Sequence, residues 1–268
     1  MSVDRPIVDR PSVTVERDGH VLLIGVDRVA KRNAWNLDVI AKVAAAYDVL
    51  AADDEVRVGV LFGHGDHFSA GLDLAEVLPA MQSQGPSVLS GASTHDPFGL
   101  WGAPVPKPVV MAVQGIAFTL SIELALASDI VVAADDVRFR QLEVGRGILP
   151  FGGATLRAPA QLGWGNAMRF LLTGEEFGAA EALRIGLVQE VVPAGEQLPR
   201  ALELARLIAT QAPLGVYGTL ANARVACRRE AAAVEHLRGL LPALLASEDA
   251  AEGVRSFVER RAARFTGR

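Results

Sequence analysis

The pattern of apolar and polar positions near the start of the chain predicts a hairpin followed by a helix. Residues 13–17 and 21–27 alternate as strands do, and Asp18-Gly19 between them is a typical hairpin turn. Residues 36–50 place apolar side chains three and four positions apart, the spacing of a helix with one buried face. Asn36 belongs to a residue type that caps helix N-termini, so we expect the helix to begin there.

The next part of the chain repeats an order of strand, turn, helix and strand. The runs 56–62, 109–113 and 130–133 are continuously apolar, as strands buried on both faces are, whereas 73–81 and 120–128 are helical in pattern. This order is typical of the α/β class.

The last part of the chain has a different character. From about residue 198 it is rich in alanine and helical in pattern, with breaks at Pro213 and Pro242 and no strand signal. The sequence therefore predicts an α/β core over residues 1–200 and a helical region over 201–268.

One long segment fits neither pattern. Residues 82–108 are rich in glycine, proline and serine and show no periodicity. A segment of this kind inside a compact domain is either a binding loop or lid, or a disordered insertion on the surface. The sequence leaves both interpretations open.

Composition and charge narrow the classes of protein. Half of the 268 residues are hydrophobic, which excludes a disordered chain, and a net charge of -5 with a pI of about 5.6 argues against a nucleic-acid partner. The only cysteine, Cys227, suits a reducing compartment. The N-terminus shows no apolar signal segment, and charged residues interrupt the apolar stretch 109–134. We therefore expect a cytoplasmic protein that does not bind membranes.

Several common chemistries lack their residues. No Rossmann or P-loop glycine pattern follows a strand, and Ser69 is preceded at the second position by His67, where a nucleophile elbow needs glycine. His64 and His67 have no convincing further ligands nearby, so no metal site is expected.

Two similar turns and two glutamates remain as candidate chemistry. Residues 68–74 and 115–123 each place small residues where a strand enters a helix, and two helix N-termini facing one point could form an oxyanion hole. Glu123 lies in the most apolar stretch of the chain, where burial would raise its pKa toward the range of acid–base catalysis. The pattern around Glu143, just after the strand-like residues 137–139, by itself favours an ordinary surface carboxylate.

At these residues the sequence resembles the crotonase family, the enoyl-CoA hydratase/isomerase superfamily. Six motifs occur in the family's order: Lys31-Arg32-Asn33-Ala34-x-Asn36, Phe68-Ser69-Ala70-Gly71-Leu72-Asp73-Leu74, residues 115–130 with Glu123-Leu124-Ala125, residues 139–150 followed by Gly152-Gly153, residues 172–188, and residues 247–261. Each motif alone is modest, but their order and spacing make the resemblance strong.

The resemblance implies a crotonase-like spiral of ββα turns with a C-terminal helical region used in trimerisation. It implies a homotrimer or a hexamer formed from two trimers, an acyl-CoA substrate of the kind met in fatty acid metabolism, and no cofactor apart from the coenzyme A of that substrate. The backbone N–H groups of Leu72 and Leu120 would form the oxyanion hole. The residues implied to bind the CoA side of the substrate are Lys31, Arg32, Ala34, Ala70, Gly71, Asp73 and Leu74.

The reaction that the resemblance implies is hydration of a 2-enoyl-CoA. Glu123 would orient and deprotonate water at C3, and Glu143 would deliver a proton to C2. One departure stands out: Thr119-Leu120-Ser121 replaces the run of glycines that many family members have. It leaves open another crotonase reaction, such as isomerisation or acyl-CoA hydrolysis, and a non-catalytic acyl-CoA binder.

Overall fold

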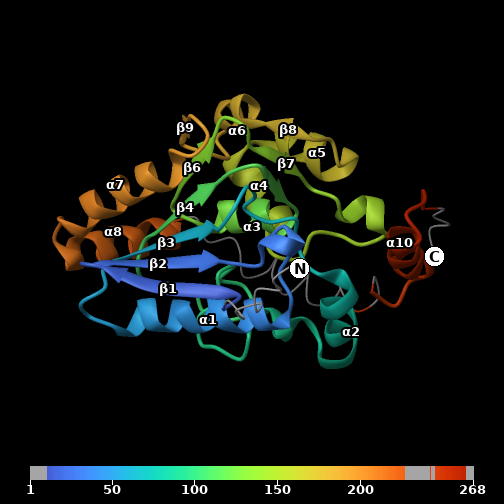
Figure 1. The fold of residues 1–268 in the computed structure, drawn as a ribbon, viewed down its shortest axis with the longest axis horizontal. Helices are drawn as coiled ribbons and strands as arrows, with labels where there is room; N and C mark the ends of the chain where they lie inside the picture. The colour runs from blue at the N-terminus through green and yellow to red at the C-terminus, as the bar shows by residue number, and fades with distance from the viewer. Residues whose placement is uncertain (1–10, 227–241, 243–244, 264–268) are drawn as a thin grey trace, which may run out of the picture.

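The structure, a computed structural model, describes residues 11–226, 242 and 245–263 (Figure 1). The strands are β1 (Val13–Asp18), β2 (Val21–Val26), β3 (Val58–Gly63), β4 (Val109–Val113), β5 (Ile116–Phe118), β6 (Ile130–Ala134), β7 (Arg138–Arg140), β8 (Phe177–Gly178) and β9 (Glu190–Val192). The α-helices are α1 (Leu37–Ala52), α2 (Leu74–Gln84), α3 (Leu120–Ala127), α4 (Ala154–Gln161), α5 (Trp164–Thr173), α6 (Ala179–Ile185), α7 (Gln197–Ala209), α8 (Pro213–Ala226) and α10 (Glu248–Val258). Short 3₁₀ turns are η1 (Val29–Lys31), η2 (Pro86–Ser90) and η3 (Glu143–Arg146).

The predicted hairpin, helices and buried strands are confirmed. β1 and β2 form the antiparallel hairpin, and the side chain of Asn36 caps α1 by accepting a hydrogen bond from the N–H of Val39 at 3.1 Å. A six-stranded sheet has the order β1-β2-β3-β4-β6-β9, parallel from β2 onward, and a three-stranded sheet has the order β5-β7-β8. The predicted α/β class is therefore confirmed.

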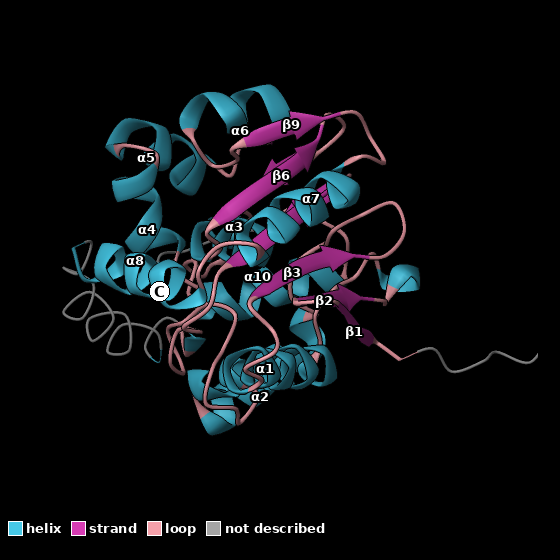
Figure 2. Cartoon of the chain, turned by 90° about the vertical axis from the view of Figure 1, so that its left-hand side faces the viewer, coloured by secondary structure: helices cyan, strands magenta, loops and turns pink. Residues whose placement is uncertain are grey.

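Helices cover both faces of the large sheet, which explains why its central strands are apolar at every position. In β3, Leu61 belongs to the core on the side of α1, whereas Val58 and Val60 face α7. The inner side of α7 is a row of alanines that lets the helix approach the strands closely, and Figure 2 shows α7 lying over β3 and β6. The alanines are Ala201, Ala205 and Ala209.

From β4 onward the chain passes back and forth between the two sheets. β4 lies in the large sheet, β5 follows in the small sheet, and α3 leads to β6 in the large sheet, after which β7 repeats the step. The sequence pattern did not predict β5, because its three residues are too short to show alternation. β5 matters for the site, since it aligns residues 115–119 with a neighbouring loop.

Residues 82–108 are ordered and have a buried interior, which excludes the disordered insertion: they comprise the end of α2, then η2, then a loop. Its side chains Leu89, Phe98 and Leu100 are buried in the main core. The buried carboxylate of Asp96 accepts hydrogen bonds from four backbone N–H groups at 2.6–3.2 Å. These donors belong to Phe98, Leu100, Trp101 and Gly102.

Two of the described helices after residue 196, α7 and α10, pack in different places. α7 spans the predicted domain boundary at residue 200 and covers the large sheet. α10 lies at the edge of the molecule, away from the sheet (Figure 1), and packs against η3. The division at residue 200 and the trimerisation role of residues 201–268 stay predictions. No helix in the described part of the chain is long and apolar enough to cross a bilayer.

Candidate active site

The two turns that the sequence singles out lie side by side. Ser69 and Ala117 form a parallel bridge, in which the N–H of Ser69 donates to the carbonyl of Ile116 at 3.0 Å and that of Phe118 donates to Ser69 at 3.0 Å. Beyond this bridge, the N–H groups of Leu72 and Leu120 donate to no other group among the described residues. The fold thus brings both predicted oxyanion-hole donors together at adjacent turns, each with an available N–H.

Thr119, just before Leu120, has a strained backbone. Its φ of 50° and ψ of -107° lie in a region that glycine adopts easily and a β-branched residue rarely does. Holding a threonine there costs about 1–3 kcal/mol, which the surrounding hydrogen bonds must offset. The departure from the family's glycines therefore keeps a glycine-like backbone path, and the N–H of Leu120 remains at the start of α3.

The residues predicted to bind the CoA side of the substrate gather on two adjoining loops. The N–H of Ala70 donates to the carbonyl of Arg32 at 2.9 Å, and a bridge between Trp35 and Leu72 continues the contact. Lys31 and Arg32 are exposed at the rim of these loops. Of the remaining predicted contacts, Gly71 is buried and the others are partly exposed: Ala34, Ala70, Asp73 and Leu74.

Arg28 joins these two loops, although no sequence pattern singled it out. Its Nη1 donates to the carbonyl of Ala34 at 2.8 Å and to Oδ2 of Asp73 at 3.0 Å. Asp73 is thus engaged by the protein itself, which gives it a role in fixing the loops. The sequence does place a cation near the start of one loop and an aspartate in the other. Because the two residues are 45 positions apart, no local pattern connects them.

Glu123 is buried on α3, as its apolar neighbours predict. Its Oε1 accepts hydrogen bonds from the N–H groups of Gly152 at 2.7 Å and Ala154 at 3.3 Å. Burial raises the pKa of the Glu123 carboxyl to about 7, although these hydrogen bonds favour the ionised form. A carboxyl that is half ionised near neutral pH is suited to accept a proton.

Glu143 is also buried, which overturns its interpretation as a surface carboxylate. It opens η3, and its side chain is 8% exposed. Burial, followed by the negative charge of Glu123, raises the pKa of the Glu143 carboxyl to about 8. Among the described residues its Oε2 has no hydrogen-bond partner, and the same holds for both amide atoms of the neighbouring Gln141. Buried polar atoms without a partner are uncommon and need an explanation, which makes this turn a candidate functional site.

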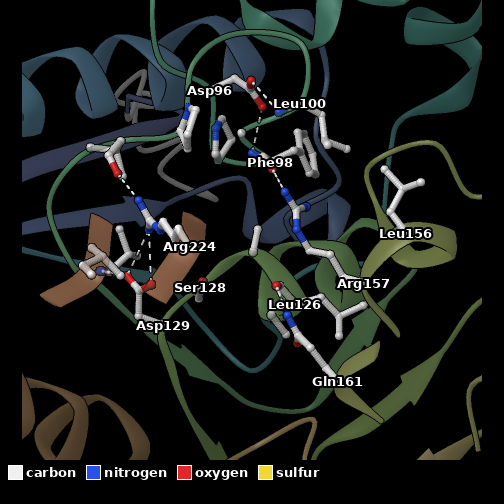
Figure 3. Close-up of a pocket in the computed structure, with 18 of the residues that line it drawn as sticks. Asp96, Phe98, Leu100, Leu126, Ser128, Asp129, Leu156, Arg157, Gln161 and Arg224 are labelled. Carbon is white, nitrogen blue, oxygen red and sulfur yellow. Dashed lines mark hydrogen bonds and ion pairs between the residues drawn. The ribbon is translucent and has the colours of Figure 1, made fainter. Parts of the chain in front are cut away.

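A cavity of about 780 Å³ lies near Glu123, and neither of the two glutamates lines it. Phe98 stands between: its ring lines the cavity and also packs against Gly152, next to Glu123. The charged groups of the cavity pair with one another or with the backbone (Figure 3). Arg224 binds Asp129 at 3.2 Å, and Arg157 donates to the carbonyl of Phe98 at 2.8 Å. Because the charged groups of the cavity are already paired, the candidate catalytic groups are the two glutamates and the adjoining turns.

The two histidines of the glycine loop do not point to a common centre. His64 contacts the hydroxyl of Thr14 at 2.9 Å through Nε2, whereas His67 accepts from the N–H of Ile116 at 3.3 Å through Nδ1. No group of three possible metal ligands gathers within the described residues.

Comparison with known proteins agrees with this geometry over nearly the whole chain. The family model described as enoyl-CoA hydratase/isomerase matches residues 16–268. Enoyl-CoA hydratase EchA19 of Mycobacterium tuberculosis is 35% identical over 96% of this chain and 97% of its own length. The 2,3-dehydroadipyl-CoA hydratase of Escherichia coli is 33% identical over 95% and 98%.

Solved structures give the same result. The crystal structure of a probable enoyl-CoA hydratase/isomerase from Mycobacterium abscessus is 48% identical, with a TM-score of 0.78 over 97% of this chain and 100% of that one. The fold and site define a protein of the crotonase superfamily, so the predicted crotonase-like fold is confirmed. The chain belongs to the enoyl-CoA hydratase/isomerase family.

Proposed function

We propose that this chain is an enzyme that adds water across the double bond of a 2-enoyl-CoA to give a 3-hydroxyacyl-CoA. The observation that carries the proposal is the pair of buried glutamates next to two available backbone N–H groups. Relatives named as hydratases, at 33–35% identity over nearly their full length, support it.

The two carboxyls divide the reaction between them. Glu123, whose ionised form is favoured by the N–H groups of Gly152 and Ala154, removes a proton from water as the water oxygen bonds to C3. The double-bond electrons move toward the thioester, whose oxygen becomes negative and is held by the N–H groups of Leu72 and Leu120. Burial and the charge of Glu123 favour the protonated form of Glu143, which gives its proton to C2. Water is thereby added without any other reactant, and proton exchange with solvent resets the pair.

The CoA part of the substrate is proposed to lie along the two adjoining loops. Exposed Lys31 and Arg32 offer positive charge to its phosphates. The segment from Ala70 to Leu74 lies beside them and contains Leu72, whose N–H is the proposed oxyanion donor. No cofactor is needed in this scheme, since coenzyme A is part of the substrate.

The proposal is tested with a panel of 2-enoyl-CoA esters from four carbons to long chain. Loss of the conjugated thioester absorbance is followed, and products made in labelled water are identified by mass. We expect 3-hydroxyacyl products, and a loss of turnover of about a hundredfold or more in both Glu123→Gln and Glu143→Gln. Formation of an isomer, of free acid and CoA, or of no product at all would replace hydration by another crotonase activity or by simple binding.

We also propose that the protein acts as a homotrimer or as two trimers joined in a hexamer, within the cytoplasm. Large apolar side chains exposed on α5 and α10 support an assembly: Trp164 is 71% exposed, Leu172 68% and Val258 67%. Light scattering at micromolar concentration tests this assignment, and a monomer would contradict it.

A further inference from the structure

We infer that the hydroxyl of Thr119 is a third donor in the oxyanion hole, alongside the two backbone N–H groups. This inference rests on the proposed function, because it concerns the thioester oxygen of the same substrate. It assigns a catalytic contact to a position at which the family commonly has glycine, and which therefore has no side chain in those relatives.

The position of the hydroxyl carries the inference. A Cβ added to Gly71 would overlap with Oγ1 of Thr119, so the hydroxyl lies directly against the residue that precedes Leu72. Thr119 itself precedes Leu120. The hydroxyl is therefore placed between the two turns that carry the backbone donors, on a residue that is partly exposed.

The hydroxyl is also free to act. Among the described residues it takes part in no hydrogen bond, although its neighbours do: Ser121 Oγ donates to the carbonyl of Ser69 at 3.3 Å, and Ser69 Oγ donates to that of Asn33 at 2.7 Å. A threonine used only to stabilise these turns would be expected to bond to one of the carbonyls there, as the two serines do.

The backbone strain at Thr119 gives an independent reason. Glycine would adopt its φ of 50° and ψ of -107° without strain. A β-branched side chain held in such a conformation next to unpaired N–H groups fits a functional contact, because strain of this kind gathers at sites where a side chain must be presented to a ligand.

Three variants of Thr119 separate the effect of its hydroxyl from the effects of its branched shape and its backbone strain. Thr119→Val keeps the branched shape and removes the donor, Thr119→Ser keeps the donor, and Thr119→Gly removes both the donor and the strain. Each is measured for turnover of a 2-enoyl-CoA, thermal midpoint, and the carbonyl stretch of bound butanoyl-CoA labelled with ¹³C at the thioester carbon. Butanoyl-CoA has no double bond to hydrate, so its spectrum does not depend on turnover.

We expect Thr119→Val and Thr119→Gly to lose about tenfold or more in kcat, since a single oxyanion donor is worth about that much or more. Thr119→Ser should stay within about threefold of the wild type. In the Val and Gly variants the carbonyl band should move to higher frequency, because the carbonyl loses a hydrogen bond. The Gly variant should also melt at a higher temperature, which separates relief of strain from loss of the donor.

Equal kcat and an unchanged band in Thr119→Val and Thr119→Gly would overturn the inference. So would equal losses in Thr119→Val and Thr119→Ser, which would assign the effect to packing. If the wild type hydrates none of the enoyl esters, the proposed function fails. The band of bound butanoyl-CoA in the wild type and in Thr119→Val still decides whether the hydroxyl contacts the carbonyl.

Discussion

Gly152 lies directly against the carboxylate of Glu123. Its N–H donates to Oε1 at 2.7 Å, and a Cβ at this position would overlap with Oε2. The glycine is therefore both a hydrogen-bond donor to the proposed catalytic carboxyl and the only residue type that leaves room for it.

Gly152→Ala should displace the Glu123 carboxylate and lower turnover by about a hundredfold, because small misplacements of a reacting group can cost that much. The variant is compared with Gly165→Ala on α5, where an added Cβ would meet nothing within 4 Å. We expect Gly165→Ala to keep wild-type kcat. Wild-type turnover in Gly152→Ala would show that the carboxylate position tolerates movement.

The raised pKa values of the two glutamates predict a stability that falls as pH rises. In the folded state these carboxyls keep their protons up to about pH 7 and 8, whereas an unfolded glutamate ionises near its ordinary pKa of 4.5. Between pH 4.5 and 8 the folded state therefore binds more protons than the unfolded state, and the free energy of unfolding decreases with pH.

Glu143→Gln removes one of these groups and should flatten that decrease. Relative to the wild type, the variant should gain stability between pH 5 and pH 8, with the thermal midpoint rising by about 2–4 °C for each kcal/mol gained. Glu76→Gln on the exposed face of α2 is the control and should leave the slope unchanged. A wild-type slope in Glu143→Gln would mean that Glu143 ionises normally in the folded protein.

Arg28 is predicted to fix the loops that carry the CoA-side contacts. Arg28→Met removes its bonds to Ala34 and Asp73 and leaves the aspartate without its cation. We expect KM for the enoyl-CoA to rise about three- to tenfold with kcat nearly unchanged, the pattern of lost ground-state binding. Arg17→Met, an exposed arginine whose ion pairs are 3.6 Å or longer, should leave KM unaltered. A fall in kcat alone would instead place Arg28 in the chemical step.

Asp96 is predicted to hold the loop of residues 82–108 in shape. Asp96→Asn replaces one acceptor oxygen with a donor that faces backbone N–H groups, so the free energy of unfolding should fall by about 1–3 kcal/mol. Turnover should fall as well, since Phe98 on this loop packs beside Gly152. Chemical denaturation of this variant and of exposed Asp54→Asn measures the difference, and equal midpoints would count against the role of Asp96.

The sequence predicts most of the scaffold because its elements depend on local patterns. The helix that begins after Asn36 needs only its cap and its periodicity, and the continuous apolar runs become the strands covered by α1 and α7. β5 escaped prediction because a three-residue strand is defined by its partner β7, not by its own alternation. Burial of Glu143 escaped prediction by the pattern alone for a related reason: the groups that cover its turn come from distant parts of the chain.

The candidate site likewise has features that local sequence predicts and features that depend on distant residues. Glu123 could be singled out because a carboxylate is rare in so apolar a stretch. Its hydrogen-bond donors lie 29 and 31 positions further on, and no local pattern connects them to it. The left-handed backbone of Thr119 is equally invisible in the sequence, since its own residue type argues against that conformation.

The contact between α10 and η3 has a consequence for the order in which the protein matures. Cβ atoms on Gly147 and Gly253 would overlap with the carbonyls of Asp249 and Arg146, so this late helix packs backbone to backbone against the turn that begins at Glu143. Ribosomes make the N-terminal part first, and the sheet and both oxyanion turns can form while synthesis continues. The turn that begins at Glu143 gains this packing partner only once α10 has been translated. A nascent chain that stops before α10 can thus fold the two turns at Leu72 and Leu120 while the turn of Glu143 still lacks this packing.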